Sequence, residues 1–295
     1  MISKVALNVP TGSSALKPQY PMLGLVRKAF PYRQPGAHFG SYGSLVLVAP
    51  CNMACGYCDV GGYAKDSEHN LPGWHLLDLH EIEAFVDQEV ADGHVIYLTG
   101  GEPLMFPELV RHLGLRVRER GGYVVVCTNA SAKHRLIKSS AFVDEFSISL
   151  KGTPRTAEKI SGVSGRLAFD LPYKNTASLL ASGPCKVELV VVLFDSVSYD
   201  EFCGIYAPFF GKAHLTLKEY RPKVTTVDDD HSYKTVISPN LFTEGARPMS
   251  AEAARALYRR LVEEQPEIRG MISLVLGGGG DQTVLDDAGE RLFTR

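Results

Sequence analysis

The sequence has no long hydrophobic run, no excess of charge of one sign and few cysteines for its length. No apolar stretch approaches the roughly 20 residues that cross a bilayer, and the first 19 residues have no apolar core of signal-peptide length. The 31 basic and 33 acidic residues leave a net charge of −2, which argues against broad binding to nucleic acids or to membrane surfaces. We therefore expect a cytoplasmic protein with neither a membrane nor a nucleic-acid partner.

What the sequence does have is enough hydrophobic residues for a large core and one dense group of cysteines. The 45% hydrophobic content excludes a disordered chain, and 295 residues suffice for one large domain. Six cysteines are too few for a disulfide scaffold, yet three of them lie within eight residues. In a reducing compartment, such a group indicates metal binding or catalysis.

Short apolar runs alternate with amphipathic stretches along the chain. The runs are continuous, which is typical of strands covered on both faces. They are Ser44–Val48, His94–Leu98, Tyr123–Cys127, Glu145–Leu150, Lys186–Phe194 and His214–Lys218, with a possible extra strand at Met271–Leu276. Six strands with crossover helices predict an α/β fold with a mainly parallel sheet. Eight such units would close a barrel, so six favour an open, partial (β/α)6 barrel.

The helices between these strands have recognisable ends. Asp78 and Glu81 form a capping-box pattern that opens a helix over Leu79–Asp92. Pro107 fits the first turn of the next helix, which Gly121 and Gly122 end. Ser250 fits the N-cap of a later helix that runs to about Gln265.

Three segments of different character divide the chain. Residues 1–43 show little periodicity and predict an irregular N-terminal arm. Residues 44–222 carry the strand–helix alternation and form the expected core, and residues 223–295 form a C-terminal extension with a helix and the possible extra strand. Residues 222–249 are polar and contain three consecutive aspartates, which fits either an unstructured linker or a lid that faces the substrate.

The cysteine group has the spacing C-x3-C-x2-C, at Cys51, Cys55 and Cys58. Three thiolates this close together can converge on one soft metal centre. Structural zinc usually takes four protein ligands, and no fourth cysteine or histidine lies within a few residues. An iron–sulfur cubane held by three cysteines keeps one iron open to a further ligand. A zinc loop completed by a distant Cys127 or His69, or simply buried cysteines, are the alternatives.

A second motif, Gly100-Gly101-Glu102, follows the second apolar run. Its glycines let the backbone approach a ligand closely. Together with the cysteine motif, in which Tyr57 is the aromatic residue before the last cysteine, this order resembles the radical S-adenosylmethionine (SAM) superfamily. The resemblance implies a partial barrel, a [4Fe-4S] cluster on the three cysteines, and SAM on the open iron. It also implies that the Gly-Gly-Glu segment hydrogen-bonds the amino group of SAM.

Two later segments add to this resemblance. Thr128-Asn129-Ala130 is similar to a stretch near SAM in many members, although Asn129 could equally form a local Asx-turn. Strand alternation points Ser149 and Lys151 towards the barrel interior. They resemble the Asp-x-Lys segment of glycyl-radical activases, whose lysine approaches the SAM carboxylate, with serine in place of the aspartate. An ordinary surface or capping lysine is the alternative.

Glu188 is the one internal charge of the fifth predicted strand. A carboxylate in a buried strand needs a partner or a ligand. Glu188 therefore either faces the ribose of SAM or the substrate, or lies at a solvated strand start.

The resemblance covers about residues 44 to 222 and implies a reaction class. An electron from a reductant such as flavodoxin or ferredoxin cleaves SAM, and the resulting 5′-deoxyadenosyl radical abstracts hydrogen from the substrate. The Lys151-Gly152 segment favours a glycyl-radical protein as substrate. The absence of the activases' histidine after the sixth strand, and the long N-terminal arm, favour a small molecule or nucleobase, as in cofactor, deazapurine or natural-product biosynthesis. A structural zinc or iron–sulfur electron-transfer module is the non-enzyme alternative.

Overall fold

The computed structural model describes residues 18–31, 42–48, 51–53, 55, 75–194, 197–219, 223–227, 233–237, 247–277, 282–287 and 289–293. Within these ranges, no helix is both long enough and apolar enough to cross a membrane.

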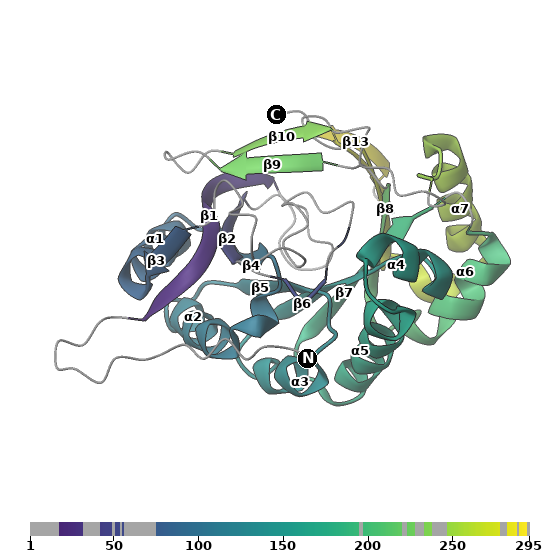
Figure 1. The fold of residues 1–295 in the computed structure, drawn as a ribbon. Coiled ribbons are helices and arrows are strands. Elements are labelled where there is room, and N and C mark those ends of the chain that lie inside the picture. The colour runs from purple at the N-terminus through teal and green to yellow at the C-terminus, as the bar shows by residue number, and fades with distance from the viewer. Residues whose placement is uncertain are drawn as a thin grey trace.

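Thirteen strands and seven α-helices make up the described fold (Figure 1). The strands are β1 (Gln19–Pro31), β2 (Tyr42–Val48), β3 (His75–Asp78), β4 (Val95–Gly100), β5 (Val124–Thr128), β6 (Glu145–Leu150), β7 (Lys186–Leu193), β8 (His214–Glu219), β9 (Lys223–Val227), β10 (Tyr233–Ile237), β11 (Ile272–Gly277), β12 (Gln282–Asp286) and β13 (Gly289–Phe293). The helices are α1 (Leu79–Ala91), α2 (Pro107–Glu119), α3 (Lys133–Ser139), α4 (Pro154–Ser161), α5 (Leu171–Ser182), α6 (Tyr199–Tyr206) and α7 (Ala251–Glu264).

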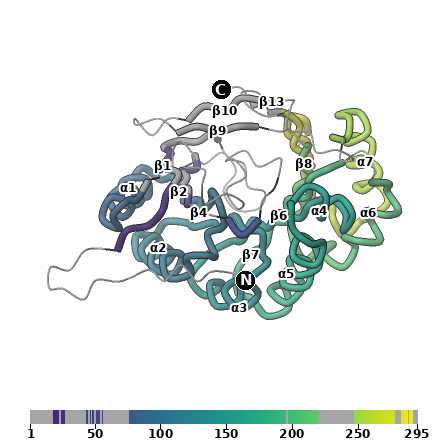
Figure 2. Tube along the Cα trace, viewed as in Figure 1, coloured from purple at the N-terminus to yellow at the C-terminus, as the bar shows by residue number. Residues whose placement is uncertain are grey.

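Eleven of the described strands form one curved sheet, in the order β13-β12-β11-β8-β7-β6-β5-β4-β2-β1-β3. Neighbouring strands from β2 through β8 to β11 are parallel. The helices lie along the outer side of the curve, and the trace passes from one strand–helix unit to the next around it (Figure 2). The α/β fold with a mainly parallel, partial barrel is therefore confirmed, and the possible extra strand is β11.

The predicted helix ends agree with the observed ones to within a few residues. Asp78 caps α1, and both hydrogen bonds of its capping box with Glu81 are present. Pro107 occupies the first turn of α2, and Ser250 caps α7 through a hydrogen bond from the backbone N–H of Ala253. Each of these signals involves residues within one helical turn, so it acts locally, and the observed helices keep it.

The irregular arm predicted over residues 1–43 is wrong where the structure describes it. Residues 19–31 form β1, which pairs antiparallel with both β2 and β3. Pro21 and Gly24 interrupt the apolar pattern of this segment, and the pairing with β2 shifts register beside Gly24. Pairing with two neighbouring strands therefore makes β1 a strand although its own sequence carries no period-2 signal.

The unstructured linker weighed for residues 222–249 is also wrong in part. Residues 223–227 and 233–237 form the antiparallel hairpin β9–β10, in which Lys223 lies opposite Ile237. The hairpin lies across the open side of the curved sheet, and β9 contacts β1 (Figure 1). Two segments far apart in sequence thus meet at the opening of the barrel.

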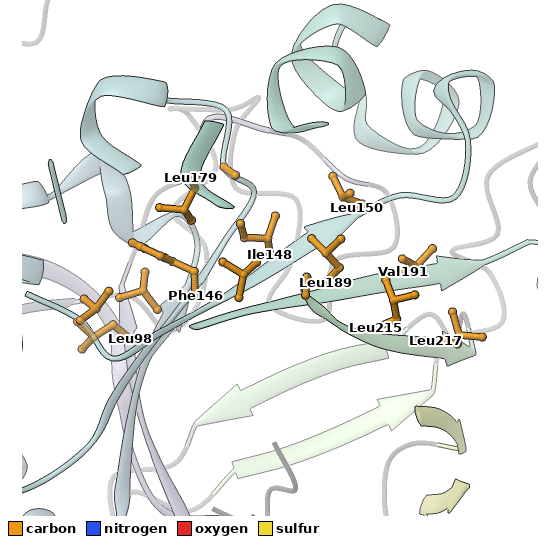
Figure 3. Packing of buried hydrophobic residues seen from close by; sticks show 14 of the residues in the cluster. Leu98, Phe146, Ile148, Leu150, Leu179, Leu189, Val191, Leu215 and Leu217 are labelled. Atoms are coloured by element: carbon orange, nitrogen blue, oxygen red, sulfur yellow. The ribbon is translucent and has the colours of Figure 1, made fainter. Parts of the chain in front are cut away.

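The two faces of the parallel sheet differ in character. Phe146, Ile148 and Leu150 of β6 are fully buried in the main core, on the side covered by Leu179 of α5 (Figure 3). Because side chains alternate along a strand, the intervening residues of β6 face the inside of the curve. The outer face therefore carries the apolar core, and the inner face is where polar side chains gather.

Candidate active site

The first part of the cysteine loop lies directly after β2, at the carboxyl end of the parallel sheet. Cys51 and Cys55 are both half-buried, and the backbone N–H of Met53 donates to Cys51 Sγ at 3.4 Å. Burial raises the pKa of Cys51 to about 11, and the hydrogen bond from Met53 opposes that rise. Metal binding at this thiol therefore involves release of a proton. Cys58, Tyr57 and His69 lie outside the described residues.

Side-chain amides join this loop to the end of β5. Asn129 Nδ2 donates to Asn52 Oδ1 at 2.8 Å, and Asn52 Nδ2 donates to Ser131 Oγ at 2.8 Å. Asn129 Oδ1 also accepts from the backbone N–H of Ser131 at 3.0 Å, which is the Asx-turn considered from the sequence. Asn129 thus makes its local turn and positions the loop that carries Cys51. Sequence reasoning missed Asn52, whose only signal was its place inside the cysteine motif.

Glu102 joins the ends of β4 and β5. Its carboxylate is buried and accepts hydrogen bonds from Thr128 Oγ1 at 2.6 Å, the backbone N–H of Asn129 at 2.8 Å and the backbone N–H of Leu104 at 3.0 Å. Burial raises the pKa of Glu102, and these donors oppose the rise. Both carboxylate oxygens are therefore occupied by donors of this chain.

The two glycines before Glu102 lie at the end of β4 and just after it. The backbone N–H of Gly101 donates to Val48 O at 2.7 Å, so this segment stays paired with β2. Gly100 has a φ of +101°, a backbone conformation that side chains with a Cβ rarely adopt. The turn thus requires glycine at this position independently of any ligand.

Lys151 follows β6 and is 3% exposed. No hydrogen bond or ion pair joins its Nζ to any side chain in the described ranges. Its charge favours the ionised forms of Cys51 and Glu102, which places it on their side of the barrel. Because a buried ammonium without an ion-pair partner is unfavourable, this position fits a bound carboxylate. Ser149, on the same face of β6, is half-buried.

Glu188 lies on the inner face of β7 and is 3% exposed, so the solvated strand start considered for it is excluded. Ser147 Oγ donates to Oε2 at 2.6 Å, and Thr216 Oγ1 donates to Oε1 at 2.5 Å. Burial raises the pKa of Glu188, and the two hydroxyls oppose the rise. Cys127 is half-buried on β5, two strands away from Glu188, and burial raises its pKa to about 12.

Another group of possible metal ligands lies at the opposite end of the strands. Atoms of Glu89, Asp92 and His94 lie within 4.8 Å of one another. Glu89 Oε2 is hydrogen-bonded to His94 Nδ1 at 2.8 Å and accepts from Ser44 Oγ at 2.6 Å. These contacts satisfy a buried carboxylate beside the starts of β2 and β4, so we assign the group a structural role.

Comparison with known proteins defines the class to which this site belongs. The sequence model of the Radical SAM superfamily matches residues 46–207, more than half of the chain. The chain therefore belongs to the radical SAM superfamily, whose members use SAM and an iron–sulfur cluster.

The individual relatives share little sequence identity with this chain. The chain is 22% identical over 200 residues to the 7-carboxy-7-deazaguanine synthase of Methanospirillum hungatei, an alignment that covers 64% of this chain and 80% of that protein. It is similar in fold to Streptococcus suis SuiB bound to S-adenosylmethionine, with a TM-score of 0.53, 15% identity and coverage of 77% of this chain. The chain spans 48% of the length of SuiB. TYW1 with a lysine-pyruvate adduct bound matches with a TM-score of 0.48 and 14% identity over 80% of this chain and 76% of that one.

Proposed function

We propose that this radical SAM enzyme acts on a small molecule of the deazapurine class. The observation that carries the proposal is the hairpin β9–β10, which lies across the open side of the sheet and contacts β1 (Figure 1). A closed barrel opening suits a substrate that is enclosed by the chain and shielded from water. The similarity to a 7-carboxy-7-deazaguanine synthase supports the same substrate class.

The residues of this chain fit the two cofactors of the superfamily. Cys51, Cys55 and Cys58 are the proposed ligands of the cluster, and Tyr57 stands beside the last of them. When bound, the cluster and SAM supply a 5′-deoxyadenosyl radical that abstracts hydrogen from the substrate. A reductant protein such as flavodoxin or ferredoxin is the proposed electron donor.

Four positions around the strand ends are proposed to receive SAM. Lys151 is buried on the cysteine side of the barrel and makes no ion pair with the described residues, so we assign it to the SAM carboxylate. The backbone of Gly100 and Gly101 would hold the amino group of SAM, while Glu102 holds this segment against β5. Ser149, next to Lys151 on the inner face, lines the same space.

Activation of a glycyl-radical protein is the second candidate, favoured by the Lys151-Gly152 segment alone. A radical that reaches a glycine in a partner protein needs an open barrel, whereas β9 and β1 meet at the opening. None of the relatives described above is named as an activase.

In the proposed division of the chain, residues 44–222 form the core, and parts of 1–43 and 223–295 enclose the substrate.

Isotope transfer separates these candidates. The reconstituted enzyme is incubated anaerobically with dithionite and SAM, either with deuterated small metabolites or with candidate glycyl-radical proteins, and deuterium in 5′-deoxyadenosine is measured. We expect deuterium to arrive from a small molecule. A persistent glycine-centred radical on a partner protein would overturn the proposal.

Metal analysis tests the non-enzyme alternative, since a cluster contributes about four iron atoms per chain and a structural site about one zinc.

A further inference from the structure

A second lysine, Lys218 of β8, faces the inside of the barrel. Leu215 and Leu217 of the same strand are fully buried in the core on the outer face (Figure 3). Alternation along the strand therefore directs Thr216 and Lys218 inwards. Lys218 lies opposite Val192 of β7 and Val275 of β11 and is half-buried.

The ammonium group of Lys218 has no counter-ion among the residues that the structure describes. No hydrogen bond or ion pair joins its Nζ to another side chain there. Glu188, a buried carboxylate on which the charge of Lys218 acts, already accepts hydrogen bonds from the hydroxyls of Ser147 and Thr216. Burial raises the pKa of Glu188, and the charge of Lys218 only partly opposes that rise. Among the described residues, no carboxylate forms an ion pair with this half-buried ammonium, which leaves it available to a bound anion.

The two inward lysines lie in different electrostatic surroundings. The charge of Lys151 acts on Cys51 and Glu102, at the cysteine loop and the end of β4. The charge of Lys218 acts on Glu188 and Cys127, which belong to the middle of the sheet. Since β7 lies between β6 and β8, the two lysines mark two separate cationic positions on the inner face.

We propose that Lys218 binds a carboxylate of the substrate and selects substrates that carry one. This inference rests on the proposed function, in which Lys151 receives the carboxylate of SAM. An ammonium–carboxylate hydrogen bond is charge-assisted, and the enclosed position strengthens it relative to bulk water. The relative named above is a synthase of a carboxylated deazapurine, which has the group that this site requires.

Ligand binding to the reconstituted, SAM-loaded protein tests the proposal. The probes are 7-carboxy-7-deazaguanine and 7-deazaguanine, which differ only in the carboxylate, and affinity is measured by anaerobic calorimetry. Wild type should bind the carboxylated probe more tightly. Lys218→Gln should lose about tenfold or more in affinity for that probe and little for the other, and Lys218→Arg should retain most of the preference.

Controls separate a local effect from a general one. Iron content and SAM affinity of Lys218→Gln should equal those of wild type, and Lys212→Gln, which removes an exposed charge in the turn before β8, should bind both probes as wild type does. If wild type binds neither probe, the proposed deazapurine function fails, and this inference fails with it. If wild type binds both equally, or if Lys218→Gln keeps the preference, only the inference on Lys218 is overturned.

Discussion

Three of the buried carboxylates, Glu102, Glu145 and Glu188, have raised pKa values and different hydrogen-bond partners. Glu102 is held by Thr128 and backbone N–H groups, whereas Glu188 is held by two hydroxyls on neighbouring strands. Glu145, at the start of β6, is 2% exposed and accepts from the hydroxyl of Tyr123 at 2.9 Å. In each case burial raises the carboxyl pKa. The ionised form of each carboxylate therefore disfavours the folded state.

Glu145→Gln should change how stability depends on pH. Burial, with the nearby charge of Glu188, raises the pKa of Glu145 to about 7 from an ordinary 4.5. Between these values the unfolded chain has lost a proton that the folded chain keeps, so wild-type stability falls as pH rises through this window. Glutamine keeps an acceptor for Tyr123 but does not ionise. Relative to wild type, the variant should therefore gain up to about 3 kcal/mol between pH 5 and pH 8.

Urea denaturation at several pH values measures this difference. Glu263→Gln, at an exposed position of α7, serves as the matched control and should follow the wild-type pH profile. A constant difference between Glu145→Gln and wild type across this pH range would show that Glu145 titrates normally.

The cysteines should fall into two groups when each is replaced by alanine. Loss of Cys51, Cys55 or Cys58 should abolish the visible absorbance of the cluster and all SAM cleavage, because three thiolates are needed to hold it. The other three, Cys127, Cys185 and Cys203, should be dispensable for both. Iron content and absorbance of the anaerobically reconstituted variants measure the outcome. A requirement for one of the latter three cysteines would contradict the three-cysteine site.

At the scale of elements, helix α2 packs against the chain before β6 through a glycine. A Cβ on Gly114 would clash with the backbone oxygen of Phe142. The backbone of Phe142 cannot move aside as a flexible side chain would, because two hydrogen bonds fix the chain two residues later. The backbone N–H of Asp144 donates to Val124 O, and the carboxylate of Asp144 accepts from the backbone N–H of Val124. A helix-favouring residue is therefore excluded here by tertiary contact.

Two glycine-to-alanine changes in helices should have opposite effects. Gly114→Ala should destabilise the protein by about 1–3 kcal/mol, because overpacking outweighs the better helix propensity of alanine. Gly204→Ala in α6 meets no atom within 4 Å and should stabilise by up to about 1 kcal/mol. Chemical denaturation measures both. Stabilisation by Gly114→Ala would mean that α2 does not approach Phe142 this closely.

At the scale of the whole molecule, the sheet is extended beyond the parallel core on both sides. Strands β1 and β3 extend it past β2, and β12 and β13 extend it past β11. The hairpin β9–β10 then lies across the opening between these extensions (Figure 1). In the proposed function, this arrangement encloses a small substrate and covers the opening that a protein partner would need.

Removal of the hairpin should uncouple SAM cleavage from substrate turnover. Because Lys223 and Ile237 lie opposite each other, a short glycine linker can replace residues 224–236 without moving β8. Iron content and SAM affinity should be kept. Deuterium transfer from substrate should fall about tenfold or more, since the opened site admits water and positions the substrate poorly. Unchanged coupled turnover would show that the hairpin does not enclose the substrate.

Local features of the sequence predicted the strands of the parallel core and the caps of α1 and α7. Each depends on residues a few positions apart, and backbone geometry turns such spacing directly into structure. The cysteine spacing and the Gly-Gly-Glu segment likewise indicated the superfamily. In contrast, β1 contains Pro21 and Gly24, and its strand conformation comes from pairing with two distant segments.

The roles of the buried polar residues were decided by tertiary structure. Glu102 meets Thr128 only because β4 and β5 end side by side, and Glu188 meets Ser147 and Thr216 across three strands. Tertiary structure likewise decides the surroundings of Lys218, because the carboxylate of Glu188 accepts hydrogen bonds from Ser147 and Thr216 instead. A side chain's type fixes which interactions it can make, whereas the packing of segments far apart in sequence determines which of them it does make.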